Sequence, residues 1–428
     1  MSAYARAAHA LGAEISGSDG SDGPYLERLA ADGILDAAIG HRSENIPAGG
    51  EIEVFYSSAV GPENLERLAA RERGLRERPR SDLLGELSAM RRTIAVAGAH
   101  GKTTTASMIA HALLAAGMRP GWLVGAPIGG GLANAEWGEG EWLVVEADES
   151  DHSMLSLSVE IALLTNVDLD HHTAFASLAE LEEAFRAFLA LARTAIVVWD
   201  RLQPRALAAD SGGVEVVGYD VQDPLLVPGG SRFDWRGHEV TLSVPGSHNA
   251  LNATGALEAA RIAGAEAEPA IAGLAGFRGA GRRFQGLGEG PHGAWLFEDY
   301  AHHPTEIAAT LRAARTLAHR RLVAVFQPHL YSRTALLAGE FGHALALADV
   351  VVVLDVYPAR ERAEDHPGVS GMLIVRASAD AGGGKPVYWT PGFADAERVL
   401  RVVLERDDVC VVMGAGDVDA LGRALVAP

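Results

Sequence analysis

The sequence predicts an α/β protein built from three blocks. Short apolar segments of strand length alternate with longer segments of helical periodicity along the whole chain. Polar or glycine-containing turns follow most of the apolar segments, which is typical of strands that lead into helices. With 428 residues, the chain is long enough for two or three domains, each with a core of its own.

The first block covers residues 1–92, in which helices and short strands alternate. Its last part, residues 63–90, is charged and predicted to be rich in helix. The other expected elements are a helix at 1–11, a strand end at 14–17, a helix at 25–31 and a strand at 53–57.

The second block covers residues 93–276 and opens with a strand at 93–97, which a glycine turn joins to a helix at 104–116. Strands and helices then alternate, which predicts a mostly parallel sheet covered by helices. Residues 213–244 are rich in Gly, Val and turn residues and predict a small β-structure before the next helix. The remaining expected elements are strands at 142–146, 161–165 and 195–198 and a helix at 178–192.

The third block covers residues 277–428 and repeats the alternation. Residues 382–386 are expected to form a surface loop. The expected strands are 295–297, 322–326, 350–355 and 409–413, and the expected helices are 305–318, 335–346 and 394–405.

Composition and charge narrow the classes of function. The chain has 36 Lys and Arg against 56 Asp and Glu, a formal charge of -20. Such an acidic surface repels nucleic acid and anionic lipid, so we expect neither a nucleic-acid nor a membrane partner. Cys410 is the only cysteine and lies in an apolar run, so we expect an inert core thiol and no internal disulfide. The chain also lacks a signal-peptide layout at its start, and we expect a cytoplasmic protein.

The segment TIAVAGAHGKTTT, residues 93–105, runs from a strand through a glycine turn into a helix. Gly98 and Gly101 let the backbone fold so that its N–H groups face phosphate oxygens. Lys102 can supply a point charge to the β- and γ-phosphates, and the hydroxyl of Thr103 can ligate Mg²⁺. Val96 stands where the standard phosphate loop has its first glycine, but the flanking strand and helix favour nucleotide binding over an incidental turn.

Acidic and histidine residues follow the next two strands. Glu146 and Asp148 come directly after the strand at 142–146, at the sheet edge where ligands bind in open α/β folds. A carboxylate there can hold Mg²⁺, which prefers hard oxygen ligands. The string TNVDLDHH ends the following strand and offers Asp170, His171 and His172 for a second metal or for the γ-phosphate.

The string PGSHNALNA, residues 245–253, opens another helix. It places His248, Asn249 and Asn252 within the first turn or so, with the two asparagines three residues apart on one face. Asn offers a donor and an acceptor, which suits an adenine edge or a phosphate oxygen. Ordinary helix capping is the competing interpretation of this motif.

Polar clusters follow the strands of the third block as well. Arg282 and Arg283 lie in the flexible string GAGRRF, and guanidinium groups can offset charge during phosphoryl transfer. Thr305 is the expected N-cap of the helix at 305–318. The candidate ligands at these strand ends are Asp299 for a ribose hydroxyl, Tyr300 and His302 for an amino-acid pocket, and His329 and Arg333 after the next strand.

Taken together, these motifs resemble the Mur ligase family. The strings that carry the resemblance occur in the family's order across essentially the whole chain. They are AGAHGKTTT, EADESDHS, TNVDLDHH, PGSHNALNA, GAGRRF, EDYAHHPTE, FQPHLYSRT, DVYPARE and MGAGDV.

The resemblance implies three α/β domains, with ATP and Mg²⁺ as cofactors. These are a Rossmann-like UDP-sugar-binding domain at 1–92, a central phosphate-loop ATPase with a mostly parallel sheet at 93–276, and a Rossmann-like amino-acid-binding domain at 277–428. It implies that the lactyl carboxylate of UDP-N-acetylmuramate attacks the γ-phosphate and that L-alanine then attacks the acyl phosphate, in peptidoglycan synthesis. Water must be kept from that acyl phosphate, so we expect the third domain to close over the second. We expect a monomer or a weak homodimer.

The resemblance also implies roles for individual residues. Lys102, His171 and Arg283 would be catalytic, and Thr103, Glu146 and His171 would ligate the metal. The ATP-binding residues would be Gly98, Ala99, His100, Gly101, Lys102, Thr103, Thr104, His248, Asn249, Asn252, Arg283 and Asp299. The substrate-binding residues would be Tyr300, His302, His329 and Arg333.

The chain departs from the family pattern at two places. The family begins with a strand and a glycine-rich turn that cradles the UDP pyrophosphate, and residues 1–6 resemble only the end of that turn. Either the start codon is placed too late or the product binds UDP-sugar poorly. Leu330 stands where many family members carry Arg, which leaves Arg333 as the expected contact to the amino-acid carboxylate.

Two other functions remain compatible with these motifs. A related Mur-type ligase, which adds another amino acid or recycles a peptide, would carry the same phosphate loop. An N-terminally truncated nucleotide-binding protein without ligase activity would bind ATP but show no turnover dependent on UDP-sugar.

Overall fold

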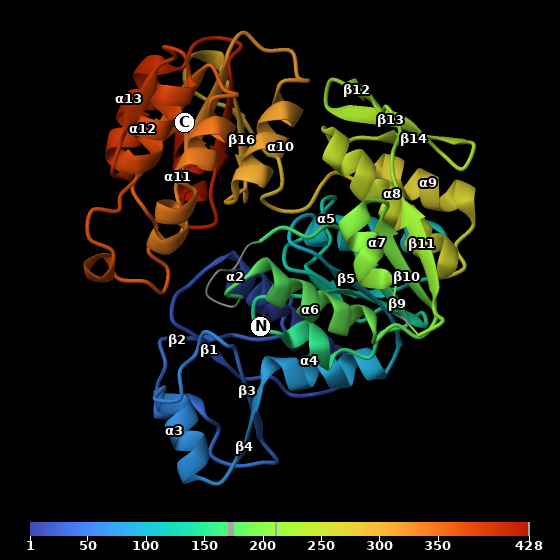
Figure 1. The fold of residues 1–428 in the computed structure, drawn as a ribbon. Coiled ribbons are helices and arrows are strands. Elements are labelled where there is room, and N and C mark those ends of the chain that lie inside the picture. The colour runs from blue at the N-terminus through green and yellow to red at the C-terminus, as the bar shows by residue number, and fades with distance from the viewer. Residues whose placement is uncertain (170–174, 210–211, 427–428) are drawn as a thin grey trace. The chain divides into compact units, whose positions relative to one another are not determined.

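The computed structural model describes residues 1–169, 175–209 and 212–426, which fall into two compact units. The first unit comprises Met1–Asp220 and Asn252–Leu274, and the second comprises Val221–Leu251 and Ala275–Pro428. Figure 1 labels the strands and helices of both units. Within the described ranges, none of the helices combines the length and the apolar character needed to cross a bilayer.

A seven-stranded sheet organises the first unit, in the order β11-β10-β9-β5-β8-β6-β7. Neighbouring strands are parallel except for β6 and β7, which confirms the predicted mostly parallel sheet. The strands are β5 (Arg92–Ala97), β6 (Gly121–Leu123), β7 (Ala135–Glu136), β8 (Trp142–Glu146), β9 (Ile161–Leu164), β10 (Ala195–Trp199) and β11 (Glu215–Tyr219).

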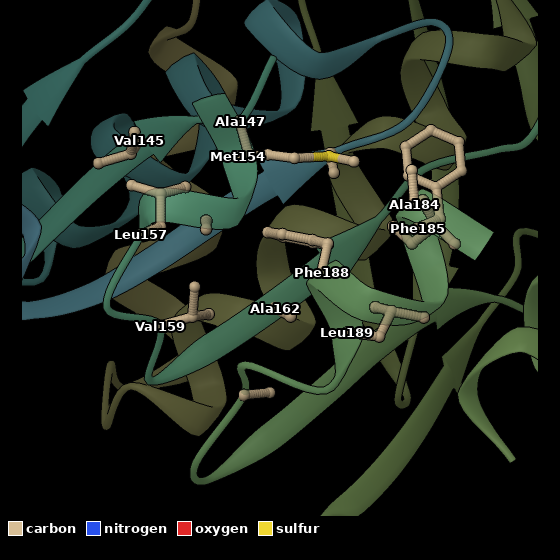
Figure 2. Packing of buried hydrophobic residues seen from close by; sticks show 14 of the residues in the cluster. Val145, Ala147, Met154, Leu157, Val159, Ala162, Ala184, Phe185, Phe188 and Leu189 are labelled. Atoms are coloured by element: carbon tan, nitrogen blue, oxygen red, sulfur yellow. The ribbon is translucent and has the colours of Figure 1, made fainter. Parts of the chain in front are cut away.

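Successive side chains of the buried strands point to opposite faces of the central sheet. Both faces are therefore apolar, and helices cover them. One face forms a core with α1 (Ser2–Ala10), α4 (Arg80–Ala89), α6 (Leu178–Leu189) and α7 (Leu202–Ala208). Figure 2 shows part of this core, which includes Met154 and Leu157 from the segment between β8 and β9, and Phe185 and Phe188 from α6. Beyond these helices, α5 (Lys102–Ala115) packs against β5 and β8, and α8 (Ser247–Ile262) and α9 (Ala267–Gly276) follow later in the chain.

The N-terminal part of the first unit contains two small parallel sheets. One pairs β1 (Ser18–Asp19) with β2 (Ala38–Ile39), and the other pairs β3 (Glu53–Tyr56) with β4 (Arg76–Pro79). The helices here are α2 (Pro24–Ala31) and α3 (Leu65–Glu72). One prediction was wrong, because the strand end expected at 14–17 lies at β1. The region expected to be rich in helix does contain α3 and α4, but it also contains the strand β4, which was not predicted. The charged strand β4 is stabilised by ion pairs rather than by an apolar pattern, since Arg67 and Arg71 both contact Glu77.

A six-stranded sheet organises the second unit, in the order β15-β16-β20-β17-β18-β19. Only the pair β15–β16 is antiparallel. The strands are β15 (Gln285–Glu289), β16 (Trp295–Asp299), β17 (Leu322–Phe326), β18 (Val350–Val353), β19 (Val387–Trp389) and β20 (Val409–Met413).

Both faces of this second sheet are covered. On one face lie α10 (Pro304–Ala314), α11 (Tyr331–Leu345) and α12 (Met372–Ala381), and on the other lie α13 (Phe393–Val403) and α14 (Asp419–Val426). Cys410 lies in the second of these cores, and burial raises the pKa of its thiol to about 12, so the expectation of an inert core thiol is confirmed.

A separate antiparallel sheet precedes α8. It consists of β12 (Leu225–Val227), β13 (Gly230–Trp235) and β14 (His238–Leu242), and confirms the small β-structure predicted within residues 213–244. The start of that range behaves differently, because β11 pairs with β10 and extends the central sheet.

Candidate functional site

The ends of three adjacent strands form the candidate site of the first unit. In the sheet, β5 lies between β9 and β8, and all three run parallel. The register pairs Val96 with Glu146 on one side and Ala97 with Leu164 on the other. The segments that follow these strands therefore begin at the same edge of the sheet, as the sequence predicted.

The loop between β5 and α5 folds tightly at two glycines. Gly98 has a φ of +130° and Gly101 has a φ of +83°, both in the region that favours glycine. A Cβ atom at Gly98 would collide with Oγ1 of Thr165, and one at Gly101 would lie 2.8 Å from Oδ1 of Asn252. Neither position accepts a side chain without rearrangement of the loop.

The segment after β9 holds this loop from the neighbouring strand. Oγ1 of Thr165 and Nδ2 of Asn166 donate to the carbonyl oxygen of His100 over 2.7 and 2.9 Å. The backbone N–H groups of His100 and Ala99 donate in return to the side-chain and main-chain oxygens of Asn166. The His100 ring lies 3.3 Å from a carboxylate oxygen of Asp168. These reciprocal bonds fix the backbone of the loop.

Lys102 begins α5 and is held inside the loop. Its Nζ donates to the carbonyl oxygens of Gly98 and Ala99 over 2.6 and 3.2 Å, and to Oε1 of Glu149 over 2.9 Å. Burial alone would lower the pKa of the Lys102 ammonium, but the carboxylates of Glu149 and Asp148 outweigh it and the pKa is raised. The ammonium group is therefore charged and pre-positioned at the loop.

Thr103 and Glu146 lie in direct contact. The hydroxyl of Thr103 donates to Oε1 of Glu146 over 2.8 Å, and the N–H of Gly125 donates to Oε2 over 2.7 Å. Thr104 follows in the same helical turn and is buried. A hydroxyl and a carboxylate side by side are the hard oxygen donors that suit Mg²⁺, so the residues present fit that ion. His171, with Asp170 and His172, lies outside the described residues.

The helix α8 places Asn252 beside the loop between β5 and α5, as the Gly101 contact shows. Its first residues belong to the second unit. There Nδ2 of Asn249 donates to the carbonyl oxygen of Pro245 over 2.8 Å. Burial lowers the pKa of the His248 imidazole to about 4, although the carboxylate of Glu306 opposes the shift. His248 is therefore neutral at pH 7.

The candidate ligands of the second unit also lie at one sheet edge. The register places Asp299, Met413, Phe326 and Val353 at the same level of β16, β20, β17 and β18. The buried carboxylate of Asp299 accepts the N–H groups of Phe284 and Ala301 over 2.8 and 2.7 Å. Burial raises the pKa of Asp299 to about 6, against the effect of the Arg283 charge and the two backbone bonds.

Tyr300 lies between the two arginines of the GAGRRF string. Its ring centroid is 4.9 Å from the guanidinium carbon of Arg282 and 5.1 Å from that of Arg283. Arg282 donates to the carbonyl oxygens of Gly414 and Gly416, whereas Arg283 lies 3.6 Å from a carboxylate oxygen of Glu306. Arg282 thus has a structural role in the loop after β20, and Arg283 lies beside the predicted amino-acid residues.

The histidines of this edge pack together. The His302 ring centroid lies 5.3 Å from that of Tyr300 and 6.1 Å from that of His329, which stacks on Tyr357 at 5.7 Å. His303, not Thr305, is the N-cap of α10, because its ring accepts the N–H of Thr305 and Glu306 completes a capping box. Histidine is not among the residues preferred at helix N-caps, so this cap was not expected from the sequence.

Arg333 is almost fully buried in the first turn of α11. Leu330, the N-cap of this helix, is also buried and has a φ of +71°, in a region that L-residues rarely adopt. Its N–H donates to the carbonyl oxygen of Tyr357 over 3.0 Å. The side chain at this position therefore packs inward rather than presenting a charge.

Sequence reasoning missed two residues that support the loop between β5 and α5. Glu149 is the buried partner of Lys102, and Asn166 makes three of the bonds that fix the loop. Both lie in strings that were recognised, EADESDHS and TNVDLDHH. A carboxylate three residues after Glu146 and an amide directly after a strand were the available signals, but spacing alone does not say which acid turns inward.

The chain matches three family profiles in order. Residues 1–92 match the catalytic domain of the Mur ligase family, residues 96–260 match the Mur ligase middle domain, and residues 282–416 match the Mur ligase, glutamate ligase domain. Together these matches extend over most of the chain.

Individual proteins are similar over the same length. The UDP-N-acetylmuramate–L-alanine ligase of Rubrobacter xylanophilus is 41% identical over 443 residues, with 100% of this chain and 97% of the relative covered. That of Nocardia farcinica is 39% identical, with 100% and 92% covered. The crystal structure of the UDP-N-acetylmuramate-alanine ligase from Thermotoga maritima is 27% identical, has a TM-score of 0.83, and is matched over 100% of this chain and 95% of that chain.

A murein peptide ligase from Psychrobacter arcticus shares the fold, with a TM-score of 0.73 at 23% identity over 100% of this chain and 95% of that chain.

Proposed function

The chain belongs to the Mur ligase family, and on that premise we propose that it joins L-alanine to UDP-N-acetylmuramate, coupled to the cleavage of ATP to ADP and phosphate. The relatives that carry this activity in their names match the chain from end to end. The reaction is an amide-forming step of peptidoglycan synthesis. A cytoplasmic location is part of the proposal, because the reaction consumes ATP.

The observation that carries the proposal is the convergence of Lys102 with Thr103 and Glu146. The ammonium lies in the phosphate loop, and the hydroxyl and carboxylate lie 2.8 Å apart at the edge of the same strands. Thr103 and Glu146 would hold Mg²⁺, which when bound neutralises charge on the nucleotide phosphates. The backbone N–H groups of the loop and the Lys102 ammonium would bind the β- and γ-phosphates.

The chemistry then follows from charge and proximity. A carboxylate oxygen of the muramyl substrate attacks the γ-phosphorus, the bond to the bridging oxygen of ADP breaks, and an acyl phosphate forms. Lys102 offsets the negative charge that spreads over the transferring group. The amine nitrogen of L-alanine attacks the acyl carbon, one proton leaves the nitrogen, and inorganic phosphate departs with its C–O bond electrons.

The residues of the second unit complete this proposal. Arg283 and Asp299 would reach the nucleotide, and Tyr300, His302, His329 and Arg333 would form the amino-acid site. The proposal keeps the division into three domains, residues 1–92, 93–276 and 277–428. It also keeps the closure of the third domain over the second, because water would otherwise hydrolyse the acyl phosphate.

The test is a substrate panel. Purified protein is incubated with UDP-N-acetylmuramate, ATP, Mg²⁺ and one of L-alanine, glycine, L-serine or a tripeptide, and both ADP release and the mass of the ligated product are measured. We expect product with L-alanine at the highest kcat/KM. Preference for the tripeptide would contradict the proposal in favour of a peptide-recycling ligase, and ATP binding without any UDP-sugar-dependent turnover would refute ligation altogether.

A further inference from the structure

Arg80, the first residue of α4, lies against an acidic segment, residues 146–151, which begins at the last residue of β8. Its Nε and Nη2 atoms donate to Oδ2 of Asp151 over 3.0 and 2.6 Å, and Nη2 also donates to Oδ2 of Asp148 over 3.3 Å. One guanidinium group is therefore shared by two carboxylates. A planar donor fork makes such a bridge more readily than a single ammonium group.

The acidic segment and the residues after it are fastened to the N-terminal part of the unit at further points. The hydroxyl of Ser58 donates to Asp151 over 3.2 Å. The N–H of Ser158 donates to Oγ of Ser88 on α4 over 2.9 Å. A Cβ atom at Gly85 would lie 2.7 Å from the carbonyl oxygen of Ser156, so α4 approaches the chain closely here.

The same segment contacts the phosphate loop through its other acids. Glu146 accepts the hydroxyl of Thr103, and Glu149 accepts the ammonium of Lys102. Along the segment, the acids that contact the loop, Glu146 and Glu149, thus alternate with the acids that contact Arg80. Burial would raise the pKa of Asp148, but Lys102, the N–H of Ser150 and Arg80 keep it lowered, so Asp148 stays charged between the two cations.

We propose that Arg80 is a positioning residue of the ligation reaction. By bridging Asp148 and Asp151, it fixes the acidic segment so that Glu149 and Glu146 hold Lys102 and Thr103 in the geometry that phosphoryl transfer requires. This inference rests on the proposed function, since it assigns Arg80 an effect on that reaction. Without Arg80, two neighbouring carboxylates lose their shared counter-charge and repel each other.

Arg78 provides a matched control two residues away. Its Nε donates to Asp82 over 3.1 Å and its Nη2 donates to Glu86 over 2.6 Å. It therefore also bridges carboxylates: Asp82 and Glu86 belong to α4, and Glu53, which lies 3.6 Å from its Nη1, belongs to β3. Loss of Arg78 removes an ion-pair bridge of the same kind without releasing the acidic segment.

The experiment compares the variants Arg80→Ala, Arg80→Lys and Arg78→Ala of the full chain. For each we would measure kcat, KM for ATP and for L-alanine, the melting temperature, and the Kd of a fluorescent ATP analogue with Mg²⁺. We expect Arg80→Ala to lower kcat by about tenfold to a hundredfold, the scale of an error of about 1 Å in a catalytic group, with KM for L-alanine unchanged. Arg80→Lys should recover part of the loss, and millimolar guanidinium should restore activity to Arg80→Ala but not change Arg78→Ala.

The outcomes separate this inference from the proposed function. If wild type and Arg78→Ala ligate normally and Arg80→Ala does too, the positioning role is wrong and the function stands. A loss of melting temperature in Arg80→Ala without loss of kcat, or without rescue by guanidinium, would reduce Arg80 to a structural ion pair. If wild type does not ligate, the proposed function fails. In that case the Kd of the ATP analogue still tests the inference: equal Kd values for Arg80→Ala and wild type would refute an effect of Arg80 on the phosphate site.

Discussion

The ammonium of Lys102 lies 2.9 Å from Oε1 of Glu149, a carboxylate whose side chain is only 1% exposed. A cation and an anion buried together hold each other charged, and either one alone would be costly. In the proposed reaction, the Lys102 ammonium supplies the positive charge that the γ-phosphate needs. Glu149 is therefore the counter-charge of Lys102, and we expect a bound phosphate to share this ammonium with it.

Glu149→Gln should destabilise the nucleotide-free protein by about 3 kcal/mol, since it leaves a buried ammonium without its anion. Mg²⁺ with ATP should recover part of that loss, because the phosphates supply a new counter-charge. Urea unfolding with and without nucleotide measures both effects. An identical loss of stability in the two conditions would mean that the phosphates do not reach Lys102.

Gly98→Ala should weaken ATP binding by more than tenfold, because the new Cβ collides with Thr165 and the φ of +130° does not suit alanine. Gly117→Ala is the control: Gly117 also has a positive φ, +74°, but a Cβ there meets nothing within 4 Å. The control should cost about 1 kcal/mol of stability and leave the Kd for ATP unchanged. Equal Kd values for both variants would argue against a phosphate-binding role of the loop.

Thr103→Val keeps the size of the side chain and removes the hydroxyl that donates to Glu146. We expect the Mg²⁺ concentration for half-maximal activity to rise by at least about tenfold, the usual scale for the loss of a partner of a metal ligand. Thr105→Val serves as the control, since within the described residues the buried hydroxyl of Thr105 makes no hydrogen bond. A Mg²⁺ requirement that is the same in both variants would remove Thr103 from the metal site.

The low pKa of His248, about 4, makes stability depend on pH. The unfolded chain takes up a proton near pH 6.5, whereas the folded protein does so only near pH 4. The contribution of the neutral ring is therefore complete above pH 6.5 and is lost as the pH falls from 6.5 towards 4. Between pH 7 and pH 5 we expect a loss of about 2 kcal/mol that is absent in His248→Gln. Equal pH dependence of the two proteins in chemical denaturation would contradict the burial argument.

The turn between β5 and α5 could be predicted from sequence because local patterns determine it. An apolar strand, two glycines and a helix start place Lys102 and Thr103 without knowledge of the rest of the fold. The position of Glu146 followed in the same way, since the strand Trp142–Glu146 was predicted with its observed bounds. Parallel strands then bring separate motifs to one edge.

Long-range contacts could not be predicted from spacing. Glu149 contacts Lys102, whereas Asp148 contacts Arg80, which is 68 residues from Asp148 in sequence. Short strands such as β6 and β19 carry too few residues for a periodic pattern. The cap at His303 depends on Glu306 rather than on a standard capping residue, and was therefore placed two residues too late.

The most direct test of the account is product formation by the double variant Lys102→Met with Glu149→Gln, compared with Glu149→Gln alone. The double change replaces the buried ion pair with neutral side chains of similar size, so the loop can fold without an uncompensated charge. If Lys102 neutralises the transferring phosphoryl group, the rate of ligation should fall by about 10²–10³-fold relative to Glu149→Gln. An unchanged rate in the double variant would contradict the central claim.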